Sequence, residues 1–510
     1  MQTALVSVTD WIIVVPVLLP LLAAALLLIL QGRFVSPSIL TGLAVLGVGV
    51  GDLFLLRRVL PGQPLAMTMG RWLPPFGISF VADALGAAFA LAAAVVTLSV
   101  LVYGRSEPPA ARAGWAFYAL VLVLLSGVDG AFLTGDLFNL YVWFEVMLIA
   151  SFGLLVFSAT PIALDGALKY GLLNFLATSL FLLALGLLYG TLGTLNMADV
   201  IARAGGTNTA VLTAIAALLL VAFGTKAAAL PLNAWLPASY HTPPAAVSAL
   251  LGGILTKVGV YALLRTLVLL LPANRDLLEP LLAVVAGATL VLAPLGAIAE
   301  GNLRRAVGYL LIGGIGAAVV GLCVPNPDGI GGAVAYPIHA MLTISALYLA
   351  AGLIEDAAGG PEVNRMGGLY AVNAPLSVLF LVLTFAIAGV PPFLGFWPKL
   401  MLLQGAAALG TPWAFALAVC LLLNALLTLL AGGRLWARIF WRPADSEIEN
   451  RSNAPPNRRA LAFGSACGLA GLVLVLGLWP EPLLLTARAA AAGLLAPDAY
   501  VSAVGMGGRR

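Results

Sequence analysis

Residues 134–157, TGDLFNLYVWFEVMLIASFGLLVF, are apolar over the length of a membrane-crossing helix, with Asp136 in the turn at the start and one further charged side chain, Glu145, near the centre. A transmembrane helix needs about 20 such residues. Similar runs recur along the 510-residue chain, of which 62% is hydrophobic and only 9% charged, with a mean hydropathy of +1.07. At roughly 22 residues per crossing the chain has room for about fourteen spans. The sequence therefore predicts an all-α polytopic membrane protein.

Apolar windows between glycines, prolines and charges place the spans within one membrane domain, 1–510. The expected spans lie near 11–31, 37–56, 76–103, 115–134, 137–158, 167–190, 210–234, 245–271, 278–299, 305–324, 330–354, 372–404, 413–440 and 459–480. We expect the domain to comprise N-terminal helices 1–3 (1–103), a first five-helix repeat (115–271), a second five-helix repeat (278–440), and the last helix with its tail (459–510). The alanine-rich tail after Pro482 is suited to lie along the membrane surface.

Prolines interrupt the seventh span at Pro231 and the twelfth at Pro391 and Pro392. A proline removes a backbone donor and opens the helix, which is tolerated at membrane depth where the freed carbonyls face protein or a wet cavity. The two breaks lie five spans apart, and because five is odd the two units would have opposite orientations. This spacing predicts two inverted five-helix repeats with broken helices 7 and 12.

Charge and cysteine content exclude several classes of protein. A net charge of +4 without a basic stripe is too weak for nucleic-acid binding. Cys323, Cys420 and Cys467 lie singly in apolar runs, with no CxxC spacing and no adjacent histidine, which argues against an iron–sulfur cluster, a zinc site or a disulfide. We expect no cofactor, no metal and no catalytic chemistry in this chain.

Basic residues in the connecting loops predict the orientation. Thirteen lie in odd-numbered loops and six in even-numbered ones, so the odd loops are expected to be cytoplasmic and both termini non-cytoplasmic. The odd loops contain Arg33, Arg105, Arg112, Lys169, Arg304, Arg305, Arg365, Arg434, Arg438, Arg442, Arg451, Arg458 and Arg459. The even loops contain Arg57, Arg58, Arg71, Arg203, Arg265 and Arg275.

Ionisable side chains inside the spans are the first candidates for function, because each costs at least about 3 kcal/mol on insertion scales. Glu145 lies in the fifth span, Lys226 just before Pro231, Lys257 near the centre of the eighth span, and Lys399 just after the second proline break. Three of only four lysines thus lie inside or beside spans. A desolvated lysine can release its proton, whereas an arginine effectively cannot. The pattern favours a proton or cation path.

Each candidate has a structural alternative. Glu145 is also consistent with a neutral buried acid that is hydrogen-bonded to a neighbouring helix. Lys226 is also consistent with a side chain that snorkels to the interface. His339, on a helix rich in glycine and alanine, suits a polar anchor or a relay member equally well. Lys169, near a helix entry, is equally consistent with snorkelling and with an ion-path role.

Asp136 and His241 are secondary candidates, because both lie beside loops. We expect Asp136 to anchor the TGD turn, and His241, which is next to prolines, to be structural or at the rim. Asp83 is likewise expected to anchor loops, and Asp52 to pair at the interface with Arg57 or Arg58.

Three segments resemble the proton-translocating antiporter-like membrane subunits shared by respiratory complex I, membrane hydrogenases and Mrp cation/proton antiporters. They are TGDLFNLYVWFEVMLIASFGLLV (134–156), FGTKAAALPLNAWLPASYHTPPAAVSALLGGILTKVGVYALLRT (223–266) and AGVPPFLGFWPK (388–399). Within that superfamily the sequence is most similar to the family of D-type subunits of Mrp Na⁺/H⁺ antiporters, which the ending LLAPDAYVSAV (494–504) also resembles. The resemblance covers nearly the whole chain and implies a fourteen-helix core of two inverted five-helix repeats.

The resemblance also implies site roles. The fifth-helix glutamate of the family falls on Glu145, the lysine of the broken seventh helix on Lys226, the eighth-helix lysine on Lys257, the eleventh-helix histidine on His339 and the twelfth-helix lysine on Lys399. Glu145 and Lys226 would form a pair whose separation or approach tunes the pKa of the lysine. Lys257, His339 and Lys399 would continue a polar axis.

The chain departs from the family pattern in the tenth and eleventh helices. Gly313, Ala340 and Ile344 stand where relatives often carry polar residues. The middle of the relay is therefore expected to be apolar, with water or another subunit bridging Lys257 to Lys399.

These observations lead to ranked hypotheses. The first is a proton-translocating subunit of a multi-subunit Mrp-type Na⁺/H⁺ antiporter in the inner membrane of a bacterium, with sodium handled wholly or partly by partner subunits. The second is a pump module of a redox-driven complex. A self-contained permease for an organic solute would need a roomy polar pocket, against which the few polar residues argue. A scaffold that has lost transport would account for the apolar tenth and eleventh helices.

Overall fold

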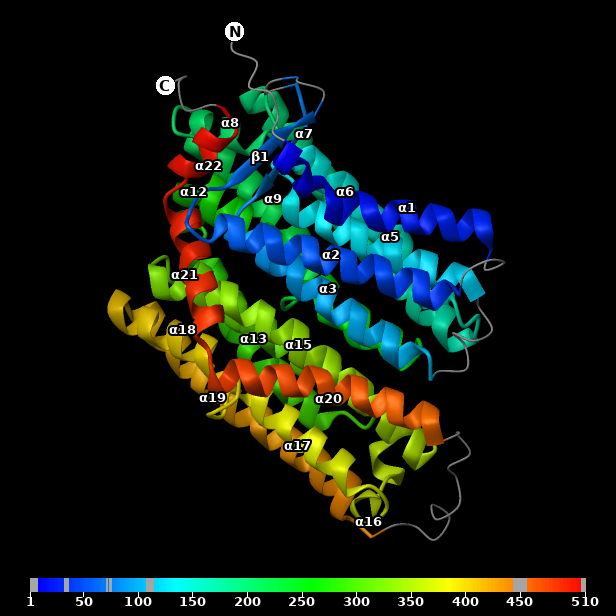
Figure 1. Ribbon diagram of the computed structural model, residues 1–510. Helices are drawn as coiled ribbons and strands as arrows, with labels where there is room; N and C mark the ends of the chain where they lie inside the picture. Colours follow the sequence, from blue (N-terminus) through cyan, green and yellow to red (C-terminus); the bar gives the residue numbers. More distant parts are fainter. Residues whose placement is uncertain are drawn as a thin grey trace.

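The computed structural model describes residues 8–31, 36–69, 72, 76–106, 114–443 and 456–505. Within these residues, 13 helices are long and apolar enough to cross a membrane. The long helices lie side by side in one bundle (Figure 1). They are built on α1 (Val15–Leu30), α2 (Pro37–Val59), α3 (Ala84–Gly104), α5 (Gly114–Leu133), α6 (Leu137–Val156), α7 (Pro161–Leu192), α9 (Thr209–Ala227), α11 (Ala245–Leu263), α13 (Glu279–Ala299), α14 (Leu303–Leu322), α15 (Pro327–Ala358), α19 (Pro412–Trp436) and α20 (Pro456–Leu478).

The expected twelfth span, 372–404, consists of two shorter helices. Helix α17 (Ala374–Ala388) ends at Gly389, whose φ of +85° is a left-handed conformation that glycine tolerates. The chain resumes as α18 (Phe396–Leu409). Helices α17 and α18 thus occupy the range expected for the twelfth span, and the fourteenth crossing stays a prediction.

The expected seventh span, 210–234, is also interrupted. Helix α9 stops at Ala227, and after a run of turns the chain forms the short helix α10 (Trp235–Ser239). Both interruptions contain an X-Pro peptide bond in the cis form, Leu230–Pro231 and Pro391–Pro392. The opposite orientation of the two repeats stays a prediction, as do the domain boundaries.

A two-stranded antiparallel sheet corrects the third expected span. Strand β1 (Leu65–Thr68) pairs with β2 (Ser79–Ala82), and Leu65 lies opposite Ala82. Helix α3 therefore begins at Ala84 and not at 76. The residues of β2 are buried and run straight into the apolar helix, so hydropathy alone does not separate them.

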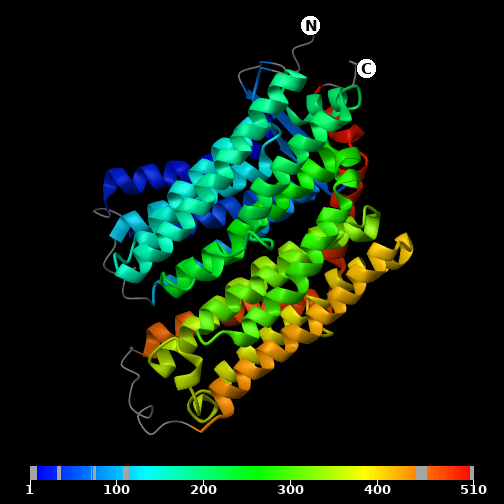
Figure 2. The same cartoon turned by 180° about the vertical axis from the view of Figure 1, so that it is seen from behind.

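The chain progresses across the bundle from one side to the other. In both views the N-terminal helices (blue and cyan) lie on one side and α17, α18 and α19 (yellow to light orange) on the opposite side, with green helices between them (Figures 1 and 2). Helix α21 (Glu481–Leu495) runs along one end of the bundle, where it packs against α15 and α3. This placement is consistent with a tail that lies along the membrane surface.

Short elements complete the described chain. They are η1 (Val8–Val14), α8 (Met197–Ala204), the π-helix η3 (Leu264–Leu270) that extends α11, α12 (Pro272–Leu277), η4 (Val363–Arg365), α16 (Leu369–Val372), the π-helix η5 (Ala437–Trp441) that extends α19, and α22 (Asp498–Ala503).

The predicted orientation rests partly on residues that the structure does not describe. Arg33, Arg71, Arg112 and Arg451 lie outside the described residues, as do the side chains of Arg458 and Arg459. One assignment in the count is wrong. Arg265 is not a loop residue, because its side chain is fully buried in η3.

Candidate functional site

Lys226 lies in the last turn of α9, directly before the first helix break. The side chain is only 1% exposed, and its Nζ has no hydrogen-bond partner among the described residues. The nearest aromatic rings are those of Phe144 and Tyr170, whose centroids lie 5.9 and 5.7 Å from Nζ. A buried ammonium without an acceptor is costly, so this position is poised for a change of protonation or of partner.

The backbone groups freed by the break find partners other than Lys226. Pro231 has no N–H to continue the helix. The N–H of Leu230 donates to Oγ1 of Thr289 (3.1 Å) on α13, and Trp235 Nε1 donates to the carbonyl of Thr225 (2.9 Å). Because other side chains satisfy these groups, the Lys226 ammonium is left available.

Glu145 lies on α6 at the edge of the bundle and is partly exposed. It lines an open groove of about 560 Å³ between α6 and α7, together with residues such as Tyr141 and Thr178. Glu145 interacts electrostatically with Lys226. Lys226 Nζ nevertheless lacks a hydrogen-bond partner among the described residues, so the pair expected from the sequence is separated and not in contact.

Lys257 lies on α11, which passes directly beside the first break. It is fully buried, and its Nζ donates to the carbonyl of Gly252 (2.8 Å). Gly259 of α11 allows the two helices to pack closely at the end of α9, because a Cβ at this position would lie 2.5 Å from the backbone N of Ala227. The lysines of α9 and α11 thus belong to one tightly packed region.

His339 lies on α15, beside the second break. The ring is fully buried, with Nδ1 3.1 Å from Oγ1 of Thr343 and Nε2 without a partner among the described residues. Gly395, in the break, packs against it, since a Cβ at Gly395 would lie 2.8 Å from Nε2. The unbound ring nitrogen therefore faces the second break.

Lys399, in the first turn of α18, is 5% exposed. Its Nζ donates to the carbonyl of Ala388 (2.8 Å) and lies 3.4 Å from Oδ1 of Asn424. The last carbonyls of α17 thus hold the ammonium, as the negative end of a helix dipole favours. Asn424 is not recognisable from the sequence, because a single amide in an apolar span carries no pattern of its own.

The structure brings the second half of the predicted set together. His339 interacts electrostatically with both Lys257 and Lys399. Of the residues expected to form an apolar gap, Ala340 and Ile344 are buried and apolar, but Gly313 packs against Asn424, with its Cβ position 3.1 Å from Nδ2. The interval between the two lysines is therefore more polar than the sequence indicated.

Lys169 does not join this set. Its side chain is 51% exposed on α7 and forms an ion pair with Asp165 (2.5 Å). It lies on the outer surface of the bundle, apart from the buried lysines.

Asp136 and His241 lie at the ends of helices. Asp136 caps α6 by accepting the N–H of Asn139 (2.9 Å), and burial raises its pKa to about 6. His241 Nδ1 lies 2.9 Å from the carbonyl of Pro237, and burial, aided by the positive charge of Arg305, lowers the pKa of the ring to about 4. At neutral pH His241 is therefore a neutral rim residue.

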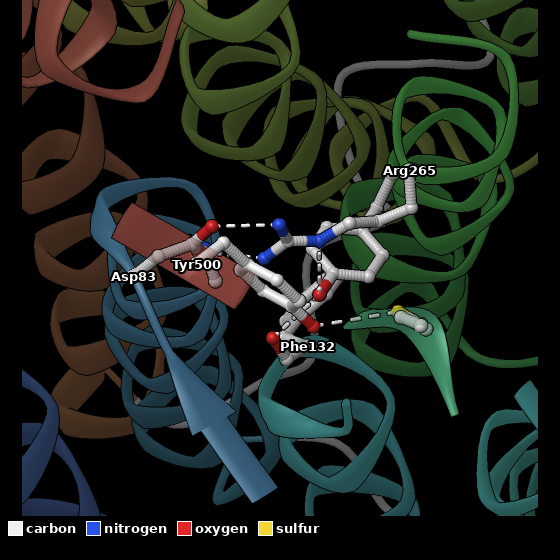
Figure 3. A network of polar contacts seen from close by, with 7 residues as sticks. Asp83, Phe132, Arg265 and Tyr500 are labelled. Carbon is white, nitrogen blue, oxygen red and sulfur yellow. Dashed lines mark hydrogen bonds and ion pairs between the residues drawn. The ribbon is translucent and has the colours of Figure 1, made fainter. Parts of the chain in front are cut away.

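A buried ionic network connects α3, η3 and the C-terminal segment (Figure 3). Arg265 donates to both oxygens of Asp83, at 2.6 Å each, and its Nε donates to the hydroxyl of Tyr261 (2.9 Å). The ring of Tyr500 lies 5.5 Å from the guanidinium carbon. Asp83 also caps α3 through the N–H of Gly86 (2.9 Å), which confirms its expected anchoring role.

Asp52 does not pair with Arg57 or Arg58. It is fully buried and its carboxyl oxygens have no hydrogen-bond partner among the described residues, whereas both arginines are exposed. The arginines follow Asp52 by more than one turn, so they do not share its face of α2.

Ionisable side chains buried at two helix breaks within a polytopic bundle are typical of ion-translocating membrane proteins. Residues 134–424 match the family described as NADH:quinone oxidoreductase/Mrp antiporter, transmembrane. The chain belongs to this family.

Full-length relatives agree with the family match. The chain is 34% identical to the D-type subunit of the Na(+)/H(+) antiporter of Alkalihalophilus pseudofirmus, over 97% of this chain and 99% of the relative. It is 35% identical to the protein of the same name from Bacillus subtilis, over 96% and 99% of the two chains. The fold is similar to a chain in the structure of the Mrp complex from Dietzia sp. DQ12-45-1b, with a TM-score of 0.88, 28% identity and coverage of 98% and 100%.

Proposed function

We propose that this chain is the proton-translocating subunit of a multi-subunit Na⁺/H⁺ antiporter in a bacterial inner membrane. Protons would move along Glu145, Lys226, Lys257, His339 and Lys399. The names of the relatives support the antiporter assignment, and their description as subunits supports assembly with partner chains. The predicted orientation, with both termini non-cytoplasmic, is part of the proposal.

One observation carries the proposal: three lysines are almost completely buried and none of them forms an ion pair within the described part of the chain. Lys226, Lys257 and Lys399 are 1%, 0% and 5% exposed, and Lys257 and Lys399 are held by neutral acceptors. A structural lysine at such depth would normally be paired with a carboxylate. Lysines held by backbone carbonyls can exchange a proton without breaking a salt bridge.

Glu145 is suited to the entry or exit of this path. It lies in the groove between α6 and α7, open to the outside of the bundle, while it interacts with Lys226 inside. We infer that it connects the buried lysines to the surroundings of the subunit, either solvent or a partner chain.

A pump module of a redox-driven complex is the second candidate. The family itself favours it, since its description covers NADH:quinone oxidoreductase as well as Mrp antiporters. It would use the same residues but take its energy from electron transfer in a partner.

The test is cation/proton antiport in everted membrane vesicles containing the intact complex. Glu145→Ala, Lys226→Ala and Lys399→Ala are each expected to lower the rate by about 10²-fold or more, as expected when a group that transfers the proton is removed. Lys169→Ala, at an exposed ion pair, should keep the wild-type rate. Wild-type rates in all three buried variants, with normal assembly, would overturn the proposal.

A further inference from the structure

Two carboxyl groups outside the lysine path lie buried between the N-terminal helices. Asp52 on α2 and Asp129 on α5 are both 0% exposed. None of their four carboxyl oxygens has a hydrogen-bond partner among the described residues, and the two groups interact electrostatically with each other. Two buried, unpartnered acids on separate helices cannot both remain ionised without a cation.

Helix α1 packs against the same region. The Cβ position of Gly51, next to Asp52, lies 3.7 Å from Cγ1 of Val15. Ser126, one turn before Asp129, donates its hydroxyl to the carbonyl of Val17 (2.8 Å). The adjacent N-terminal helices lie on one side of the bundle in both views (Figures 1 and 2).

The same stretch of α1 supplies a further oxygen without a helical partner. Pro20 lies inside α1 and has no N–H, so it leaves the carbonyl of Pro16 without its intrahelical donor. Helices α1, α2 and α5 pack against one another, so they bring two carboxyl groups, a carbonyl and a hydroxyl into the same region, and none of these groups offers a nitrogen or sulfur ligand. Hard cations prefer such all-oxygen surroundings.

Within the described residues, no fixed positive charge neutralises the two acids. Helices α1 and α3 carry no charged residue, and Arg57 and Arg58 at the end of α2 are exposed. The charged groups of the other packed helices are Glu145 on α6, which lines the outer groove, and Lys257 on α11, which is held by Gly252. The remaining titratable side chains of α3, α6 and α11 are the tyrosines Tyr103, Tyr141 and Tyr261. In η1 only Asp10 is charged, and its side chain lies outside the described part of the chain.

We propose that Asp52 and Asp129 form a monovalent-cation site at which Na⁺ and H⁺ compete for the same two carboxyl groups. One Na⁺ enters as one H⁺ leaves, so the charge of the site is conserved in the exchange. The site rests on the proposed antiporter function and adds to it a place within this chain where the two transported ions meet.

The test is equilibrium binding of radioactive sodium to the purified intact complex at several pH values. Asp52→Asn, Asp129→Asn and the double variant preserve side-chain volume but remove the charge. Each should raise the sodium concentration for half-saturation at least roughly 10- to 100-fold, the loss that substitution of even an outer-shell partner causes at a metal site. Asp276→Asn, at an exposed carboxylate paired with Arg275, is the matched control. A double variant with wild-type sodium binding and pH dependence would overturn the proposal.

A second measurement uses the wild-type complex, in case the variants fail to assemble. A hydrophobic carbodiimide reacts with protonated carboxyl groups inside the membrane, and mass spectrometry of the labelled chain locates the adduct. Sodium should protect Asp52 and Asp129 from labelling, and acidification should restore it. Labelling of these residues that sodium leaves unchanged would contradict the site.

The binding test also separates this inference from the lysine path. Lys226→Ala should leave sodium binding at the acid pair intact even where antiport is lost. Sodium binding that depends on Asp52 and Asp129 while the lysine variants transport normally would uphold the site and reject the lysine path.

Discussion

The two lysines beside the helix breaks are held in different ways. Lys399 is bound by the carbonyl of Ala388 and lies beside the amide of Asn424, whereas Lys226 has no acceptor among the described residues and faces two aromatic rings. Hydrogen bonds to a charged group contribute about 1.5–3 kcal/mol each. The two ammonium groups are therefore stabilised by different means, hydrogen bonds at Lys399 and, at Lys226, aromatic rings together with the charge of Glu145.

Replacement of Asn424 with leucine tests this difference. Asn424→Leu removes the oxygen beside Lys399 and the donor to the carbonyl of Leu290 (2.8 Å). We expect the antiport rate to fall by roughly tenfold, equivalent to about 1.4 kcal/mol, in vesicles with normal amounts of the complex. Gln404→Leu, at an exposed position of α18, is the control. Equal rates in the two variants would argue against a role for the amide.

The charged members of the path are recognisable from the sequence, but their neutral partners are not. Glu145, Lys226 and Lys257 stand out because an ionisable group is rare in an apolar span. Asn424 and Thr289 act through contacts with helices far away in the sequence, which no local pattern reveals. Asp129 lies in the apolar span before the TGD turn, and only the fold shows that it interacts with Asp52.

At the scale of elements, a glycine allows close packing at each helix break. The first glycine lies on the helix that passes the break, and the second lies in the break itself. Gly259 of α11 packs against Ala227 at the end of α9, and Gly395 packs against the carbonyl of Ala386 and the ring of His339. Small residues let helix backbones approach closely inside a membrane. The lysines lie at these approaches, so the geometry of the path depends on them.

Gly259→Ala should therefore damage transport. The added Cβ would lie 2.5 Å from the N of Ala227, so the end of α9 and Lys226 must shift, and overpacking of this kind costs about 1–3 kcal/mol. We expect antiport to fall by roughly tenfold or more. Gly224→Ala is the control. Gly224 lies near the end of α9 and no atom lies within 4 Å of its Cβ position, so this variant should keep the wild-type rate. Loss of activity in the Gly224 variant but not in the Gly259 variant would contradict this account.

The ends of the helices can be predicted from the sequence where the hydropathy pattern and the proline positions indicate the same boundary. Both breaks fall at the prolines that indicated them, although α9 ends at Ala227, before Pro231 itself, because proline and the turn around it exclude helical structure upstream. The β1–β2 hairpin was missed, since a short buried strand and the start of a buried helix have the same apolar character.

At the scale of the whole molecule, the C-terminal segment ties together parts that are distant in sequence. Helix α21 packs against α3 and α15, and Tyr500 of α22 covers the Arg265–Asp83 ion pair. Arg265 is 1% and Asp83 13% exposed at the side chain. The pair connects η3 to the start of α3, so its integrity affects the assembly of the whole bundle.

Asp83→Asn should destabilise the protein strongly. It leaves the buried guanidinium unpaired, which costs about 3–5 kcal/mol, and we expect a lower thermal unfolding midpoint of the purified complex in detergent. The double variant Asp83→Leu/Arg265→Met removes both charges and should recover part of the lost stability. A double variant that is less stable than Asp83→Asn would contradict this explanation.

Tyr500 contributes through its ring more than through its hydroxyl. The ring centroid lies 5.5 Å from the guanidinium carbon of Arg265, while the hydroxyl makes a long contact with Sδ of Met197 (3.6 Å). Tyr500→Ala should lower the unfolding midpoint by the equivalent of about 3–5 kcal/mol, because it leaves a cavity at a buried position as well as removing the cation–π contact. Tyr500→Phe should remain close to wild type, and equal losses in both variants would point to the hydroxyl instead.

The global fold was the most predictable feature, because composition and span length together fix the class and number of helices. The burial of Arg265 was not predictable, since an arginine near the end of an apolar run looks like a loop residue until Asp83 is placed beside it. The arrangement of the C-terminal segment likewise depends on long-range contacts alone.

The central claim is that the buried lysines release and accept protons during antiport. The most direct measurement is the antiport rate of the intact complex in everted vesicles with Lys226→Arg, Lys257→Arg or Lys399→Arg, and with Lys169→Arg as control. Arginine keeps the positive charge but effectively cannot lose its proton. We predict that each buried variant loses most of its activity while the control retains it. Wild-type antiport in all three buried arginine variants would contradict the account.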